Sequence, residues 1–196
     1  MLIFDVNGII AGIQTAVPKA TWTPPPGPNV GHPLIDDGEF WTLTAYFIDP
    51  SRICNGRTSE DLRTEGTGTA LYIQNGTDPL KSVIQILQDE KQLVPTTQWT
   101  KGHCFYTMGD HYWYNVRADM PCNQFFPSCL LYNKGQLNAF CWALNTQLTS
   151  PRYEHPTLSV LSQFIDPVPQ CFATDPDYKA LSTMHVYFSS EISDLC

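Results

Sequence analysis

The sequence predicts a mainly β protein, an antiparallel β-sandwich or partly closed barrel, with one α-helix around 79–91 and stabilising disulfides. Short apolar runs rich in β-branched and aromatic residues recur along the chain with turn signals between them. Aromatic residues make up 12% of the 196 residues and charged residues only 15%, below the ~25% usual in soluble proteins. Such a chain favours one globular domain over 1–196, with a proline-rich connector at about 18–33.

The N-terminal segment predicts a β-hairpin. The apolar runs 2–6 and 9–17 flank Asn7-Gly8, and this dipeptide between apolar runs is a strong hairpin signal. Polar residues interrupt the segment and no Lys or Arg precedes it, so we interpret it as β structure rather than a signal peptide. Six prolines between 18 and 33 exclude a regular element there and indicate an extended connector.

The next elements are two strands and a helix. Residues 40–48 and 70–74 are typical of strands, and 53–69 of a polar loop. For 79–91, Asp78 is a suitable N-cap and Pro79 fits the first helical position. One apolar face follows at helical spacing, formed by Leu80, Val83, Ile84 and Leu87.

The C-terminal half predicts antiparallel β structure. Residues 103–108 and 111–117 flank Gly109-Asp110 and predict one hairpin, and 125–133 and 136–144 flank Lys134-Gly135 and predict a second. After them we expect a strand or helical turn at 157–165, a turn at 168–171 and a last strand at 183–189.

The cysteines indicate disulfides and a secreted, extracellular protein. They lie at wide, irregular spacing without a CxxC pair, which favours an oxidising compartment; they are Cys54, Cys104, Cys122, Cys129, Cys141, Cys171 and Cys196. Pairing around Lys134-Gly135 brings Cys129 near Cys141, where the two form a disulfide or are small buried hydrophobes. The odd cysteine allows a disulfide-linked dimer; Cys196 either staples the C-terminus or pairs with a second chain. Asn75-Gly76-Thr77 is an N-glycosylation sequon.

Charge excludes two classes of partner. The net charge is −8, and the eleven Lys and Arg residues are scattered singly. No basic stripe is present to bind nucleic acid or an anionic membrane surface. No apolar stretch approaches the ~18 residues of a membrane span.

The aromatic residues of 99–142 are the best candidate for a ligand site. This window holds eleven of the twenty-four aromatic residues. We predict binding of a small apolar or aromatic molecule, a lipid or a glycan by Tyr112, Trp113, Tyr114, Phe140 and Trp142. Strand alternation places Tyr112 and Tyr114 on one face and Trp113 on the other. The competing interpretation is that these side chains form a two-sided core.

Catalytic and cofactor motifs are lacking. None of the five histidines lies in a zinc-binding pattern, and no nucleophile elbow or phosphate loop occurs. We therefore predict no cofactor and no metal. His111 and His185 both lie beside aromatic residues in predicted strands and are weak catalytic candidates if the fold brings them together. The ordinary alternative is a hydrogen-bonded histidine in an aromatic core.

Three functions follow in order of preference. The first is a secreted β-rich protein that holds a small apolar or aromatic molecule, lipid or glycan in an aromatic-lined cavity. The second is an enzyme that uses His111 or His185 with a carboxylate in the same cavity. The third is a disulfide-linked structural or defence protein.

Overall fold

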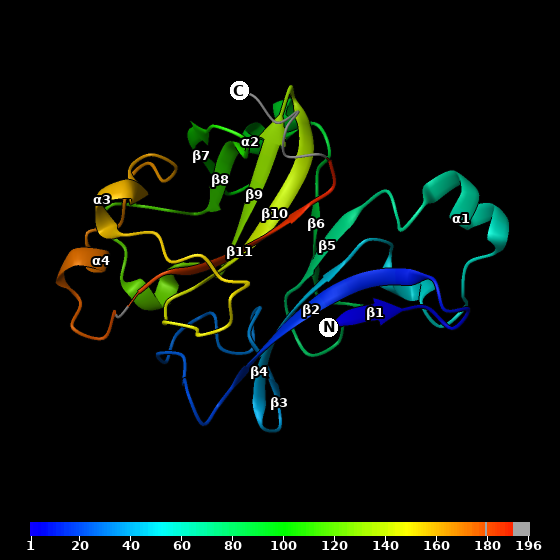
Figure 1. Cartoon of the computed structure of the whole chain (residues 1–196), viewed down its shortest axis with the longest axis horizontal. Coiled ribbons are helices and arrows are strands. Elements are labelled where there is room, and N and C mark those ends of the chain that lie inside the picture. The colour runs from blue at the N-terminus through cyan, green and yellow to red at the C-terminus, as the bar shows by residue number, and fades with distance from the viewer. Residues whose placement is uncertain (179, 190–196) are drawn as a thin grey trace. The chain divides into compact units, whose positions relative to one another are not determined.

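The computed structural model describes residues 1–178 and 180–189. The chain divides into two compact units, Met1–Ile86 and Leu87–Cys196, and each is described by itself. Antiparallel strands dominate both units (Figure 1), which confirms the predicted mainly β class. The prediction of one domain over 1–196, and of a sandwich, stays a prediction. Within the described part of the chain, no helix has the length and apolar character needed to cross a membrane.

The first unit is built on a six-stranded sheet. The strand order is β1-β2-β4-β5-β6, and β3 pairs with β4. The strands are β1 (Leu2–Phe4), β2 (Ile10–Pro18), β3 (Ile35–Asp37), β4 (Phe40–Tyr46), β5 (Leu71–Gln74) and β6 (Val83–Ile86). A 3-10 turn, η1 (Pro50–Arg52), and one helix, α1 (Ser59–Glu65), lie between β4 and β5.

The predicted N-terminal hairpin is confirmed. β1 and β2 pair antiparallel, and Gly8 at the turn has a φ of +79°, which a glycine adopts without strain. The strands predicted at 40–48 and 70–74 are confirmed as β4 and β5. Between β2 and β3 the chain runs mainly through turns.

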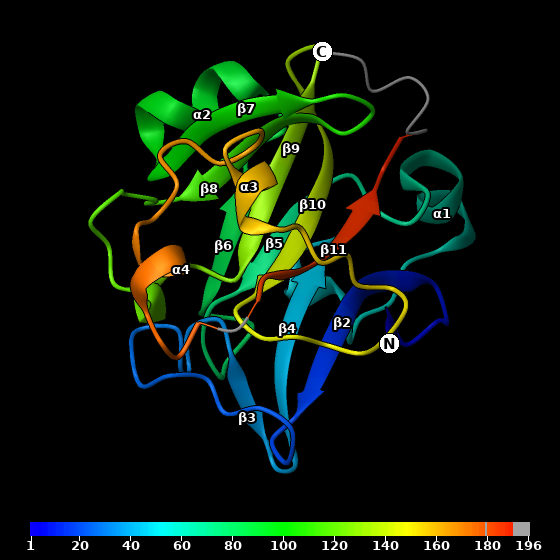
Figure 2. The same ribbon diagram turned by 60° about the vertical axis from the view of Figure 1, so that its left-hand side comes forward.

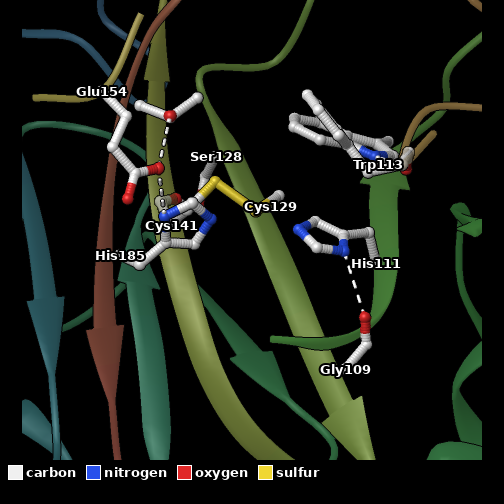
Figure 3. The surroundings of a disulfide bond; sticks show 10 residues. Gly109, His111, Trp113, Ser128, Cys129, Cys141, Glu154 and His185 are labelled. Carbon is white, nitrogen blue, oxygen red and sulfur yellow. Dashed lines mark hydrogen bonds and ion pairs between the residues drawn. A yellow bond between two sulfur atoms is a disulfide. The ribbon is translucent and has the colours of Figure 1, made fainter. Parts of the chain in front are cut away.

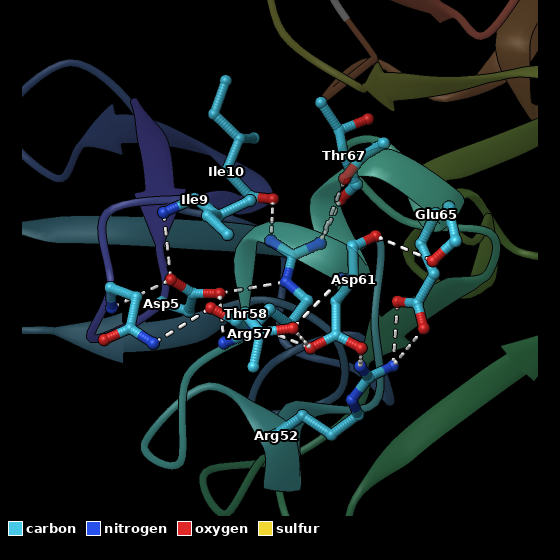
Figure 4. Close-up of polar contacts among 12 residues, drawn as sticks. Asp5, Ile9, Ile10, Arg52, Arg57, Thr58, Asp61, Glu65 and Thr67 are labelled. Atoms are coloured by element: carbon cyan, nitrogen blue, oxygen red, sulfur yellow. Dashed lines mark hydrogen bonds and ion pairs between the residues drawn. The ribbon is translucent and has the colours of Figure 1, made fainter.

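A buried ion pair fixes the turn of this hairpin (Figure 4). Asp5 accepts hydrogen bonds from the backbone N–H of Asn7 and Ile9, and Nε of Arg57 donates to its Oδ2 at 2.9 Å. The Arg57 guanidinium also donates to the carbonyls of Ile10 and Thr67. Neither side chain of the pair is exposed to solvent. Burial alone would raise the pKa of the Asp5 carboxyl, but the hydrogen bonds that it accepts outweigh burial and hold the pKa below its ordinary value.

The helix predicted at 79–91 is wrong. Residues 83–86 form strand β6, which pairs with β5 and places Leu71 opposite Ile86. Val83, Ile84 and Ile86 are β-branched and fit a half-buried sheet better than a helix. Asp78 caps a turn, in which its Oδ1 accepts from the Leu80 N–H. A helix begins later, as α2 (Glu90–Thr96), with Asp89 as its N-cap.

The prediction of a loop over the whole of 53–69 is also wrong, because helix α1 lies within it. Thr58 and Asp61 form a capping box at its start: each side chain binds the other residue's backbone N–H. This is the S/T-x-x-acid pattern that begins helices. None of the helix residues is buried, so it lacks the apolar face by which helices are recognised in a sequence.

The second unit is a five-stranded antiparallel sheet in which neighbouring strands follow one another along the chain. The strand order is β11-β10-β9-β8-β7. The strands are β7 (Trp99–Phe105), β8 (Gly109–Tyr114), β9 (Ser128–Asn133), β10 (Gln136–Leu144) and β11 (Ser182–Tyr187). Both predicted hairpins and the last strand are therefore confirmed. The predicted turn of the first hairpin is wrong: Gly109 and Asp110 lie within β8, and the chain turns at 106–108. Lys134 and Gly135 have positive φ values, as a two-residue hairpin turn requires.

The helices of this unit are short. Besides α2, they are η2 (Cys122–Gln124), α3 (Leu158–Leu161) and α4 (Cys171–Thr174). Thus 157–165 contains the predicted helical turn, and 168–171 runs into the start of α4. Figures 1 and 2 show α3 and α4 on the same side of the sheet.

Two disulfides are described in the second unit. Cys129 and Cys141 lie directly opposite each other on β9 and β10 and are bonded, which confirms the predicted pairing. A second disulfide joins Cys122 to Cys171 and so connects η2 to α4. Cys104, on β7, is also disulfide-bonded. Among the described residues, Cys54 is the free cysteine and is exposed, and Cys196 lies outside them.

Candidate functional site

Strand register places the candidate site on one face of the second sheet. Trp113 on β8 lies opposite Cys129 on β9, Cys141 lies opposite Cys129, and His185 on β11 lies opposite Cys141. His111 precedes Trp113 by two residues, so both side chains project from the same face. The register therefore brings His111 and His185 to one place from positions 74 residues apart in the sequence (185 minus 111).

A cavity of about 290 Å³ lies over this row. Its other wall comes from 154–164, the segment that contains α3. The carbonyl of Phe164 accepts a hydrogen bond from Nε1 of Trp113 at 2.9 Å, and Gly102 leaves room for this approach, because a Cβ there would lie 2.2 Å from the same oxygen. The lining residues are Phe105, Met108, His111, Trp113, Glu154, His155, Pro156, Val160, Gln163, Phe164, Thr183 and His185.

His111 is a buried, uncharged histidine. Its side chain lies between aromatic rings, with ring centroids 6.3 Å from Trp113 and 5.5 Å from Phe164. Burial, helped by the neighbouring His185, lowers the pKa of His111 to about 3. Nδ1 lies 3.2 Å from the carbonyl of Gly109. Since only a protonated Nδ1 donates to a carbonyl, Nε2 keeps its lone pair and is a hydrogen-bond acceptor.

His185 is oriented by a carboxylate at the edge of the cavity. Its Nδ1 lies 3.1 Å from Oε2 of Glu154, an ion-pair distance at an angle too poor for a full hydrogen bond. Glu154 is held against β11 by reciprocal backbone hydrogen bonds with Thr183. His185 is the main cause that lowers the pKa of the Glu154 carboxyl below its ordinary value, while burial opposes it. The carboxylate is therefore ionised at neutral pH.

The two histidines converge, as the sequence suggested they would. Their ring centroids are 6.1 Å apart at 86°. Figure 3 shows the ring nitrogens that do not face Gly109 or Glu154 pointing toward each other across the disulfide. One ring nitrogen from each histidine and Sγ of Cys129 all lie within 4.8 Å of one another. The site therefore combines an apolar wall with two imidazoles at close range.

The five aromatic residues predicted to bind a ligand are divided between two faces. Trp113 lines the cavity together with His111. Tyr112 and Tyr114 project from the opposite face of β8, as alternation requires. Phe140 and Trp142 also project from that opposite face, because Cys141 between them faces the cavity side; their rings contact each other at 5.0 Å. A single site made of all five residues is not formed.

Sequence reasoning missed the residues that close the cavity. Glu154 and Phe164 lie on either side of the short helix α3, which contains Val160, and the segment pairs with the sheet through one bridge between Glu154 and Thr183. The sequence predicted a strand or helical turn here, but no local pattern shows that the segment covers the sheet. Trp113 and His185 were found because they lie in strands.

Comparisons with known proteins add no relative. No protein-family model, no curated protein and no solved structure matches this chain.

Proposed function

We propose that this protein binds a small, largely apolar or aromatic molecule in the cavity of its second unit. The observation that carries the proposal is the cavity itself: aromatic and aliphatic side chains form its wall and two imidazoles lie together within it. Small-molecule sites are usually concave and apolar, with few polar groups that fix orientation. The cavity of about 290 Å³ is at the lower end of the ~300–1,000 Å³ typical of such sites.

The polar groups favour a ligand that carries a hydroxyl or N–H donor. Nε2 of His111 is an acceptor, because its Nδ1–H faces Gly109. Glu154 contributes negative charge at the rim, and none of the described residues that line the cavity is a Lys or Arg. A phenol or an indole combines the apolar body and the single donor that these groups require. Leaving either acceptor unpaired against a fully apolar ligand costs about 1–3 kcal/mol.

Size and burial favour this class over the lipids and glycans that the sequence also allowed. Trp113 is only 1% exposed, so its ring does not offer the open flat surface on which sugars stack. A long acyl chain exceeds a cavity of this volume. A compact planar molecule remains the best match.

The test is quenching of tryptophan fluorescence by a panel of phenols and indoles, with toluene as the matched molecule that lacks a donor. We expect saturable quenching, tighter for phenols than for toluene. Trp113→Phe should abolish the change. Trp142→Phe should retain it, because Trp142 is equally buried but projects from the opposite face. Equal quenching in both variants would contradict the proposed site.

A second candidate is an acid–base enzyme, and the Glu154–His185 pair favours it. A carboxylate that orients a histidine in a cavity is a common general-base arrangement. Among the described lining residues there is no serine and no free thiol, and in this candidate mechanism water is the nucleophile. Hydrolysis of aryl esters, measured for the natural protein and for His185→Gln, tests it; equal rates would rule out this role.

We also propose that the protein is secreted, glycosylated at Asn75 and exposed to an oxidising compartment. Its disulfides are compatible with this location. Asn75 is half-buried between β5 and β6. A mass shift on enzymatic deglycosylation, lost in Asn75→Gln, tests the glycan. A disulfide-linked dimer, the basis of the structural alternative, would run through exposed Cys54 and would vanish in Cys54→Ser.

A further inference from the structure

The histidine pair and the Cys129–Cys141 disulfide form a cluster of metal-ligating atoms. One ring nitrogen each of His111 and His185 and Sγ of Cys129 lie within 4.8 Å of one another, and Cys141 is bonded to that sulfur. Figure 3 shows the inner ring nitrogens directed toward the disulfide from its two sides. The four side chains come from the four neighbouring strands β8, β9, β10 and β11, so the sheet fixes their spacing.

The outer nitrogens of both imidazoles have the partners that metal-binding histidines usually have. Nδ1 of His111 faces the carbonyl of Gly109 at 3.2 Å, and Nδ1 of His185 faces the carboxylate of Glu154 at 3.1 Å. The Gly109 carbonyl fixes the tautomer of His111, and the charge of the Glu154 carboxylate favours a proton on the near nitrogen of His185. Both contacts leave the inner lone pair for a metal. This arrangement is a second observation, independent of the cluster, that points to a cation.

We propose that opening the Cys129–Cys141 disulfide converts this cluster into a Zn²⁺ site with His111, His185, Cys129 and Cys141 as ligands. In the oxidised protein the two sulfurs are bonded to each other, and only the imidazoles are available. A dithiol or phosphine reductant supplies two electrons and cleaves the S–S bond, and the sulfurs take up two protons. Binding of Zn²⁺ then releases those two protons as the thiolates coordinate.

The geometry and the charge suit zinc. In a tetrahedral centre with Zn–N of ~2.0–2.1 Å and Zn–S of ~2.3 Å, neighbouring ligand atoms are about 3.3–3.8 Å apart. One ring nitrogen of each histidine and Sγ of Cys129 are within 4.8 Å of one another, so side-chain movements of roughly 1 Å bring these three to ligand spacing. Cys141, released from Cys129, supplies the fourth ligand by rotation of its side chain. Two thiolates and two neutral imidazoles offset the charge of Zn²⁺. Cys129 and Cys141 are fully buried, so this neutrality avoids an unpaired buried charge.

The inference does not depend on the proposed ligand. Quenching by phenols is measured on the oxidised protein, whereas zinc binding is measured after reduction. Failure of either experiment therefore leaves the other result intact.

The experiment is equilibrium dialysis of the full-length protein against Zn²⁺, before and after treatment with a water-soluble trialkylphosphine, followed by elemental analysis. A variant in which Cys54, Cys104, Cys122, Cys171 and Cys196 are replaced by Ser or Ala removes every thiol outside the cluster. We expect one zinc per chain after reduction and at least tenfold less before it. Replacing zinc by Co²⁺ should give thiolate-to-cobalt charge-transfer absorption.

Matched variants decide between a built site and adventitious thiol binding. His185→Gln should lose the zinc, and Glu154→Gln should weaken it about 10–100-fold. His155→Gln should retain it, because His155 lines the cavity rim but bonds to the Leu148 carbonyl. The proposal would be overturned if the oxidised and reduced proteins bound the same amount of zinc per chain, or if His185→Gln kept all of its zinc. These two outcomes count against it even if reduction loosens the fold.

Discussion

At the scale of single residues, an ion pair contributes to stability according to how deeply it is buried. The Arg57–Asp5 pair has no exposed side-chain surface, whereas Arg63 and Glu60 form a pair that is mostly exposed. Removing one member of a buried pair leaves the other without a partner and costs about 3–5 kcal/mol. Exposed pairs contribute little because water and salt screen them.

We therefore expect Asp5→Asn to destabilise the protein by about 3–5 kcal/mol in urea unfolding. The reason is that Arg57 loses its carboxylate partner while it stays buried. Arg63→Ala is the matched control at an exposed pair and should leave the midpoint nearly unchanged. Similar small effects for the two substitutions would show that the Arg57 network does not fix the hairpin turn.

The uncharged state of His111 predicts a dependence of stability on pH. Its pKa in the folded protein is lowered to about 3, against ~6.5 for an unfolded histidine. Between these values the unfolded chain binds a proton that the folded protein does not, so acidification favours unfolding. The full stability is present above ~6.5 and falls by up to about 1.4 kcal/mol per pH unit below it.

Ring-proton shifts in NMR measure this directly. The His111 signals should stay constant from pH 8 to pH 5, and urea unfolding of His111→Phe should depend less on pH over that range. A His111 signal that titrates near pH 6.5 would contradict the buried, neutral assignment.

At the scale of elements, the sequence predicted hairpins well and helices poorly. Turn chemistry is local: Asn7-Gly8 and Lys134-Gly135 each specify a turn within two residues. The helix predicted at 79–91 failed because the apolar spacing that suits a helix also suits a strand beside β5, and β-branched residues decided in favour of the strand. Pairing with β5 thus decided the structure of this segment, and the spacing of apolar residues in the sequence does not reveal that pairing.

Helix α1 differs, because the sequence does contain the capping box that begins it, within a polar segment predicted as a loop. Its capping box, rather than burial, holds its first turn. We expect Thr58→Ala to destabilise the protein by about 0.5–2 kcal/mol. Thr64→Ala, the same substitution inside the helix, is the control and should cost less. Urea unfolding with circular dichroism measures both, and an equal cost would show that the cap is unimportant.

The site shows the same limit. His111, Trp113 and His185 were identified because strands place alternate residues on one face. Glu154 and Phe164 were not, because the 154–164 segment reaches the sheet through long-range contacts such as the Trp113 hydrogen bond to Phe164. Such contacts depend on the fold of the whole unit.

At the scale of the whole molecule, the two described disulfides close loops of different length. Cys122–Cys171 spans 49 residues and Cys129–Cys141 spans 12. In the chain-entropy model the longer loop contributes roughly 4 kcal/mol and the shorter roughly 3. We expect Cys122→Ala/Cys171→Ala to lower the unfolding midpoint more than Cys129→Ala/Cys141→Ala. The reverse order in urea unfolding would show that packing around the buried hairpin disulfide outweighs loop closure.

The proposed function depends on the two faces of the second sheet, which carry different sets of side chains. One face carries Trp113, His111 and His185 beneath the 154–164 segment, and the other carries Tyr112, Tyr114, Phe140 and Trp142. A ligand in the cavity therefore affects one set of side chains and spares the other.

The most direct test of this account is an NMR titration of the oxidised protein with a simple phenol, which follows the ring signals of both sets. We predict saturable shifts at His111, Trp113, His185 and Phe164, and none at Trp142 or Tyr112. Shifts confined to the opposite face, or no saturable shift with any member of the phenol and indole panel, would contradict the proposed binding site.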